Sequence, residues 1–252
     1  MAWYLYLLAI LAGTLAGFIN TLAGSGSLIT LPFLIFLGLP PTVANGTNRI
    51  GVLFQTMVSS TSFHRKGVLD WRAGLILAIP ATFGSILGAR IAVDIDEEMM
   101  QTVIGVVMVI MLMIIIVRPN RWLEGSSELL FRRPGIKEIL LFFAIGVYGG
   151  FIQAGVGIFL LAGLVLGVGY DLVRANAVKS LIIMIFTVAA LAVFVANDQV
   201  VWSLGLLMAV GQMIGGWLGA TFAVEKGAVW VRRLLIVVVA VAAAQLLGLT
   251  PF

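Results

Sequence analysis

The chain has no cysteine and a single histidine, His64, among its 252 residues. The absence of cysteine excludes disulfide bonds, thiolate metal ligands and cysteine nucleophiles. One histidine is too few for a structural zinc site. Charged residues make up 10% of the chain, whereas soluble domains carry roughly 25%. With so few groups suited to catalysis or metal binding, we expect a protein that is not an enzyme and uses no metal or other cofactor.

Apolar residues dominate what remains, at 62% of the chain. This composition predicts an all-α, polytopic helical membrane protein. We expect it to be a multi-pass protein of a bacterial or archaeal cell membrane. The net charge of +4 comes from basic residues clustered in short loops, so it does not indicate nucleic-acid binding. The expected partners are therefore the lipid bilayer and a small substrate. The oligomeric state cannot be predicted from this sequence.

Acidic residues are absent from the middle of every apolar stretch, because all 11 Asp and Glu fall in loops or at segment ends. Cation transporters and proton pumps usually carry a carboxylate within the membrane. The sequence provides cations, hydroxyls and amides there instead. This pattern indicates an anionic substrate.

Ten apolar stretches predict the membrane segments, and most approach the ~20 residues that cross ~30 Å of hydrocarbon. Two are shorter, because residues 27–39 and 157–169 would form helices only ~20 Å long at 1.5 Å per residue. We expect half-helices or re-entrant segments at these two places. The predicted segments are 3–23, 27–39, 43–63, 72–91, 99–117, 138–154, 157–169, 173–196, 200–222 and 229–249.

One short pattern occurs twice, as G-F-I-N-T-L-A-G-S-G-S-L from Gly17 and as G-F-I-Q-A-G-V-G-I-F from Gly150. Gly24 and Gly155 are 131 residues apart, and the same offset relates the asparagines that follow in each half. Such a duplication indicates two related membrane halves with a transport site at their interface. The expected organisation is a first repeat at 1–117, a cytoplasmic linker at 118–137 and a second repeat at 138–252.

Charges in the loops predict the orientation of these repeats. Basic residues cluster near Arg65, in the linker and near Arg232, and the positive-inside rule makes these loops cytoplasmic. The acidic loop around Asp96 and the cation-free loop at Asp198 are then outside. Since the loop at Asp198 is the repeat equivalent of the loop near Arg65, we expect two inverted-topology repeats with both termini outside. A parallel duplication is the alternative.

Glycine pairs are expected to break the helix in each repeat. Glycines two residues apart do not share a helix face, unlike Gly84 and Gly88, which we interpret as helix-packing positions. A half-helix that begins after Gly26 would point its positive dipole end and free N–H groups into the break, an arrangement suited to an anion. Close helix packing is the alternative interpretation of Gly24 with Gly26 and of Gly155 with Gly157. The residues assigned to the breaks are Gly24, Ser25, Gly26, Ser27 and Thr30 in the first repeat, with Gly155 and Gly157 in the second.

A polar cluster follows each short segment. Arg49 and Lys179 occupy neighbouring columns of the repeat alignment, so each half would supply one cation to a shared anion site. The alternative is that both side chains snorkel to lipid headgroups. The cluster residues predicted to bind substrate are Asn45, Thr47, Asn48 and Arg49, with Asn176, Lys179 and Ser180 in the second repeat.

Amides accompany both breaks, because Asn20 and Gln153 stand opposite each other in the two copies of the pattern. Either amide could bridge unwound backbone or contact substrate, and the sequence does not choose. Gln55 and Gln212 are isolated amides within apolar segments, and we expect them to form hydrogen bonds between helices.

The stretch A-G-F-I-N-T-L-A-G-S-G-S-L-I-T-L-P-F-L, followed by L-G-L-P-P-T-V-A-N-G-T-N-R, closely resembles the TauE/SafE family of membrane transporters. The resemblance covers nearly the whole chain and implies a carrier for small anions such as sulfite, taurine or sulfoacetate. The second copy departs from the family pattern at Gly163, where proline is expected, and at Val156, where serine is expected. By motif position the resemblance implies functional roles for Asn20, Gly24, Gly26, Pro32, Asn45, Thr47, Asn48 and Arg49, and for Gly155, Gly157, Asn176 and Lys179.

The leading hypothesis is a secondary transporter of a small sulfur-containing anion that works by alternating access between the repeats. An anion channel, or a carboxylate transporter, on the same scaffold is the alternative. A membrane enzyme is the third hypothesis, and it lacks a recognisable nucleophile and base.

Overall fold

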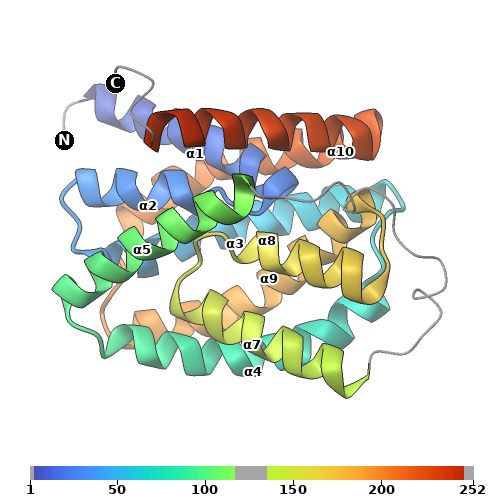
Figure 1. Cartoon of the computed structure of the whole chain (residues 1–252). Coiled ribbons are helices and arrows are strands. Elements are labelled where there is room, and N and C mark those ends of the chain that lie inside the picture. Colours follow the sequence, from blue (N-terminus) through green and yellow to red (C-terminus); the bar gives the residue numbers. More distant parts are fainter. Residues whose placement is uncertain (1–2, 117–134, 247–252) are drawn as a thin grey trace.

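The structure is a computed structural model that describes residues 3–116 and 135–246, and over these residues the chain is helical, with no strand (Figure 1). Four helical stretches in this part of the chain are long and apolar enough to cross a membrane: Tyr4–Ala23, Trp71–Val93, Leu172–Ala196 and Trp202–Gly227. The helices are α1 (Trp3–Ala23), α2 (Ser27–Phe36), α3 (Pro41–Arg65), α4 (Trp71–Val93), α5 (Glu97–Ile116), α7 (Ile136–Phe151), α8 (Val156–Ala162), the π-helical η2 (Gly163–Val168), α9 (Leu172–Ala196) and α10 (Trp202–Leu246).

Each predicted segment corresponds to a helix, and the two short ones are confirmed. The helix α2 has 10 residues, and α8 with η2 spans 156–168. Helix α7 begins at Ile136, inside the predicted linker 118–137, whose residues up to 134 lie outside the described part. The last predicted segment is the continuation of α10 beyond Gly227, where a φ of 73° interrupts the helix.

Contacts between helices come in pairs related by the repeat. The first helix of each half packs on the fourth helix of the other, as α1 on α10 and α7 on α4. Figure 1 places these two pairs at opposite edges of the molecule, with α3 and α9 between them. The third helix of each half also packs on the fourth helix of the other, and α3 packs on α9. The two halves therefore interlock instead of lying side by side as separate domains.

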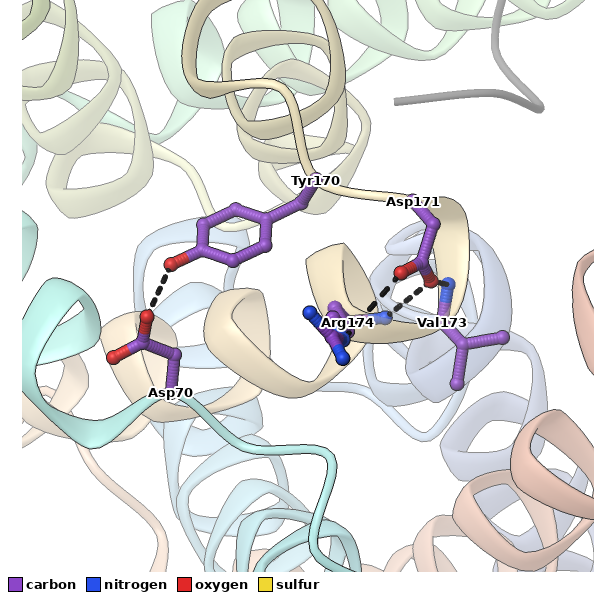
Figure 2. Close-up of polar contacts among 5 residues, drawn as sticks. All are labelled: Asp70, Tyr170, Asp171, Val173 and Arg174. Carbon is purple, nitrogen blue, oxygen red and sulfur yellow. Dashed lines mark hydrogen bonds and ion pairs between the residues drawn. The ribbon is translucent and has the colours of Figure 1, made fainter. Parts of the chain in front are cut away.

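Helices α3 and α9, which are repeat equivalents, run in opposite directions. The beginning of α3 meets the loop after α9, because the Val201 backbone N–H donates to Thr47 Oγ1 at 2.9 Å. The beginning of α9 meets the loop after α3, because the Tyr170 hydroxyl donates to Asp70 at 2.7 Å (Figure 2). These two helices, one from each half, therefore have opposite senses.

The paired helices approach each other through glycine. A Cβ added to Gly88 of α4 would lie 1.9 Å from the Val147 carbonyl oxygen of α7, and one added to Gly215 of α10 would lie 2.0 Å from the Thr14 carbonyl oxygen of α1. Small residues let helices pack closely where lipid provides no hydrophobic driving force. The packing role predicted for Gly84 and Gly88 of α4 is confirmed, and Gly215 of α10 has the same role.

The outward face of α4 is apolar. Leu75, Ile79, Phe83 and Leu87 recur every four residues and remain 47–66% exposed. Side chains at this spacing form one stripe along a helix. The stripe is suited to lipid contact, and the polar side chains described next lie inside the molecule.

Candidate functional site

Each half contains the helix break that its glycines predict. Helix α1 ends at Ala23, and Gly24 follows with a left-handed φ of 74°. Helix α7 ends at Phe151, and Gly155 adopts the same φ of 74° before α8. Left-handed backbone is strained for residues with a Cβ, which explains the need for glycine at both positions.

The two breaks touch each other at the centre of the molecule. A Cβ built on Gly24 would lie 2.3 Å from the Cα of Gly157, and a Cβ built on Gly157 would lie 2.3 Å from the Cα of Gly24. Gly26 is equally confined, because its Cβ would lie 2.2 Å from the Ala16 carbonyl oxygen. A side chain at any of these three positions would therefore clash with backbone atoms.

The second break differs from its prediction in one respect. Helix α8 begins at Val156, so Gly157 lies within the helix and not before it. The N–H groups at the first break are also less free than expected, because the Gly26 N–H donates to Asn20 Oδ1 at 3.3 Å. The N-cap positions of both short helices are glycines, Gly26 and Gly155, which have no side chain to cap the helix.

Arg49 of α3 binds the carboxyl-terminal end of α7, in the opposite half. Its Nη1 donates to the carbonyl oxygen of Gly149 at 3.0 Å, and its Nη2 donates to that of Gly150 at 2.6 Å. Asn45, one turn earlier on α3, donates to the Phe151 carbonyl oxygen at 2.8 Å. The last carbonyls of a helix lack intrahelical partners and carry its negative dipole end, so a cation there is stabilising.

Lys179 of α9 makes the reciprocal contact with α1. Its Nζ donates to the carbonyl oxygens of Asn20 at 2.9 Å and Thr21 at 2.8 Å, and to Asn176 Oδ1 at 2.6 Å. Each half therefore inserts one cation into the break of the other half. The two cations are displaced by one residue in the repeat alignment, yet they serve equivalent helix ends.

The amides beside the breaks are joined to the long helix of their own half. Asn20 Nδ2 donates to Gln55 Oε1 at 2.6 Å, and Gln153 Nε2 donates to Thr187 Oγ1 at 2.9 Å. Gln153 Oε1 also accepts from Arg49 at 3.2 Å. Of the two interpretations left open for these amides, bridging of unwound backbone is observed for Asn20, through Gly26.

Hydroxyls of α2 meet the polar cluster of α3. Asn48 Nδ2 donates to Ser27 Oγ at 3.0 Å, and Thr30 Oγ1 donates to Asn48 Oδ1 at 2.5 Å. Two of the residues predicted to bind substrate have their hydrogen-bond partners outside this cluster. Thr47 accepts from the loop before α10, and Ser180 donates to the Asn176 carbonyl oxygen of its own helix. The break residue Ser25 is buried as well.

Arg49 and Lys179 are buried, with 0% and 1% of their surface exposed. The alternative that they snorkel to lipid headgroups is therefore wrong. The ion pairs in the described part of the chain are Lys66–Glu225 and Arg174–Asp171, so Arg49 has no carboxylate partner there. Its Nε has no hydrogen-bond partner either, and its guanidinium lies 4.5 Å from the centre of the Phe194 ring. The site is a buried centre with positive charge and an unused donor.

Several contributing residues were not assigned to the site from the sequence. Gln55 was recognised only as an amide between helices, which is confirmed, and Thr187 was not singled out. The Tyr148 hydroxyl donates to the Ala154 carbonyl oxygen at 2.6 Å and supports the second break. A polar residue within an apolar helix was the available signal for Gln55 and Thr187. Tyr148 and Phe194 gave no such signal, because aromatic residues are common throughout membrane helices.

A second polar connection between the halves lies at one end of α3 and α9 (Figure 2). Asp70 accepts from the Ala73 N–H at the start of α4 and from the Tyr170 hydroxyl, while Asp171 caps α9 by accepting from the Val173 N–H. Burial, and the hydrogen bond to Asp70, raise the pKa of Tyr170 above its ordinary value. A phenol is protonated at neutral pH even at its ordinary pKa, so the raised pKa keeps Tyr170 a donor at more alkaline pH as well. The repeat-equivalent positions, Leu39 and Val201, are apolar and cannot form this bond.

The sequence pattern of the family described as sulfite exporter TauE/SafE matches residues 9–246. A probable membrane transporter protein, ORF9, of Sinorhizobium sp. is 29% identical over 98% of this chain and 94% of its own length. The probable membrane transporter protein YfcA of Escherichia coli K12 is 27% identical over 92% of this chain and 86% of its own length. A further probable membrane transporter, from Haemophilus influenzae, is 29% identical over 92% and 91%. No solved structure matches the chain.

Proposed function

Because the chain belongs to the TauE/SafE sulfite exporter family of membrane transporters, we propose that it is a secondary transporter of small sulfur-containing anions. Sulfite and sulfonates such as taurine or sulfoacetate are the substrates we favour. The observation that carries this proposal is Arg49, a buried cation without a carboxylate partner in the described residues and with a free Nε donor. A buried charge is costly unless it is paired, and an anionic substrate would supply the missing partner.

The substrate class is best tested by thermal stabilisation of the purified protein in detergent. A ligand that binds the folded state raises its apparent stability by mass action. Sulfite, sulfate, taurine and sulfoacetate should be compared with acetate and lactate. Stabilisation by acetate or lactate alone would favour a carboxylate transporter and overturn the sulfur-anion proposal.

A carrier and a channel differ in the rate and the saturation of transport. Proteoliposomes loaded with unlabelled substrate should show saturable counterflow if alternating access operates. Fluxes far above ~10³ ions per second exceed the range of typical turnover numbers and would identify a channel instead.

The opposite senses of α3 and α9 support an inverted arrangement of the two repeats in the membrane. The cysteine-free chain allows a direct test with single cysteines at Asp96, Ser126 and Asp198, of which Ser126 lies outside the described residues. Positions 96 and 198 should react with an impermeant maleimide in intact cells, and position 126 should react only after permeabilisation. Labelling at 126 together with protection at 198 would contradict the arrangement.

We propose that the Asp70–Tyr170 hydrogen bond stabilises closure of the face that the basic loops predict to be cytoplasmic. Tyr170→Phe removes one hydrogen bond, worth about 0.5–1.5 kcal/mol, so the open form of that face should be favoured by about twofold to tenfold. A cysteine at the buried Ser180 should then be labelled faster in inside-out vesicles. Tyr6→Phe, at an exposed position on α1, is the matched control. Equal labelling rates in Tyr170→Phe and the control would remove this bond from gating.

A further inference from the structure

A groove of about 570 Å³ lies on the outside of the molecule, between α3 of the first half and α10 of the second. Phe54 and Val58 line it from α3, and Met213 and Trp217 line it from α10. Its volume falls in the range of about 300–1,000 Å³ that is typical of ligand pockets. The groove is separate from the candidate site, because it is lined by none of the residues assigned to that site.

The chemistry of the groove changes from one end to the other. Along α3, its lining runs from Phe54, which is apolar, to Arg65 and Lys66, which are basic. Eleven helical residues at 1.5 Å each make this distance about 16 Å. Trp217 is 55% exposed and adds an aromatic surface to the lining of the groove. An amphiphile with a long apolar part and one anionic group at its end would match this change from an apolar to a basic lining.

The charges at the basic end favour an anion. Lys66 lies 3.4 Å from Glu225 of α10, so one of the cations already spans the two helices. Arg65 is exposed and has no ion-pair partner in the described part of the chain. Lys226, next to Glu225, is exposed as well and keeps this end positive. The loop at Arg65 is also the one that its basic residues predict to be cytoplasmic, where anionic lipids are recognised by basic pockets between helices.

We propose that this groove binds an anionic phospholipid, with an acyl chain against Phe54, Val58 and Met213 and the phosphate on Arg65 and Lys66. Arginine suits phosphate because its planar guanidinium forms two parallel hydrogen bonds. Such a lipid would contact both halves at once, so its binding would stabilise the packing of α3 against α10.

Native mass spectrometry of the purified chain provides the test, with phosphatidylglycerol and phosphatidylcholine of matched acyl chains. We expect the wild type to bind phosphatidylglycerol about thirtyfold more tightly, from two basic contacts. The double variant Arg65→Gln/Lys66→Gln should bind both lipids equally. The matched control Arg72→Gln/Arg90→Gln removes two exposed cations of α4 that do not line the groove, and it should keep the preference.

Two further variants, Val58→Trp and Thr61→Phe, fill the groove without changing its charge. Either variant, if monodisperse, should lose phosphatidylglycerol binding, and inorganic phosphate at the same concentration should not displace the lipid from the wild type. The proposal is overturned if the wild type does not distinguish the lipids, if the charge variant keeps its preference, or if folded groove-filling variants bind as the wild type does. Displacement by inorganic phosphate would identify a simple phosphate site instead.

Discussion

Arg49→Gln is expected to weaken binding of the anionic substrate by about tenfold to over a hundredfold. A hydrogen bond to a charged group contributes roughly 1.5–3 kcal/mol, and losing it lowers the affinity by this factor. Lys179→Gln should weaken binding in the same way if the two buried cations share one anion. Isothermal titration on monodisperse protein is the measurement, with Arg174→Gln as the control, because Arg174 is an exposed cation that pairs with Asp171.

The contacts of Arg49 add a structural consequence to this substitution. The carbonyl oxygens of Gly149 and Gly150 would each lose a charged donor, so the variant should also unfold at a lower temperature. Arg49→Lys separates the two effects, since it keeps the charge but cannot reach both carbonyls with a planar fork. Arg49→Lys should therefore recover more of the lost substrate affinity than of the lost thermal stability. Substrate affinity within about twofold of the wild type in both glutamine variants would remove these cations from the substrate site and leave them as helix caps.

Gly24→Ala is expected to abolish transport and to destabilise the fold. A left-handed φ costs a residue with a Cβ roughly 1–2 kcal/mol, and overpacking against Gly157 adds about 1–3 kcal/mol. Gly157→Ala lies within α8 and carries only the packing cost, so its loss of stability should be the smaller of the two. Thermal unfolding and uptake into proteoliposomes measure the two effects.

The control for the glycine variants is Gly105→Ala, because a Cβ at Gly105 meets no atom within 4 Å. Gly88 is unsuitable as a control, since its Cβ would lie 1.9 Å from the Val147 carbonyl oxygen. If Gly24→Ala and Gly157→Ala transport substrate as Gly105→Ala does, the contact between the two breaks has no part in transport.

Prediction from sequence succeeded where a local rule acts on neighbouring residues. The lengths of the apolar stretches determine the helices, and the duplicated glycine pairs locate both breaks at Gly24 and Gly155. Prediction was less complete for the polar clusters. The sequence singles out Arg49 and Lys179, and both are buried, but their partners on α7 and α1 are 100 and 159 residues away, and no local pattern identifies a carbonyl oxygen as a partner.

The sequence by itself therefore determined the membrane class, the helices, the duplication and the residue types of the polar centre, because composition and periodicity follow from the solvent that each segment meets. Only the tertiary structure shows that each cation binds a helix end of the opposite half. Arg49 and Lys179 cap helix ends across the interface between the repeats because α3 and α9 run in opposite directions through the centre. It also directed Thr47 and Ser180 to other partners, since the rotation of a helix about its axis depends on packing against all of its neighbours.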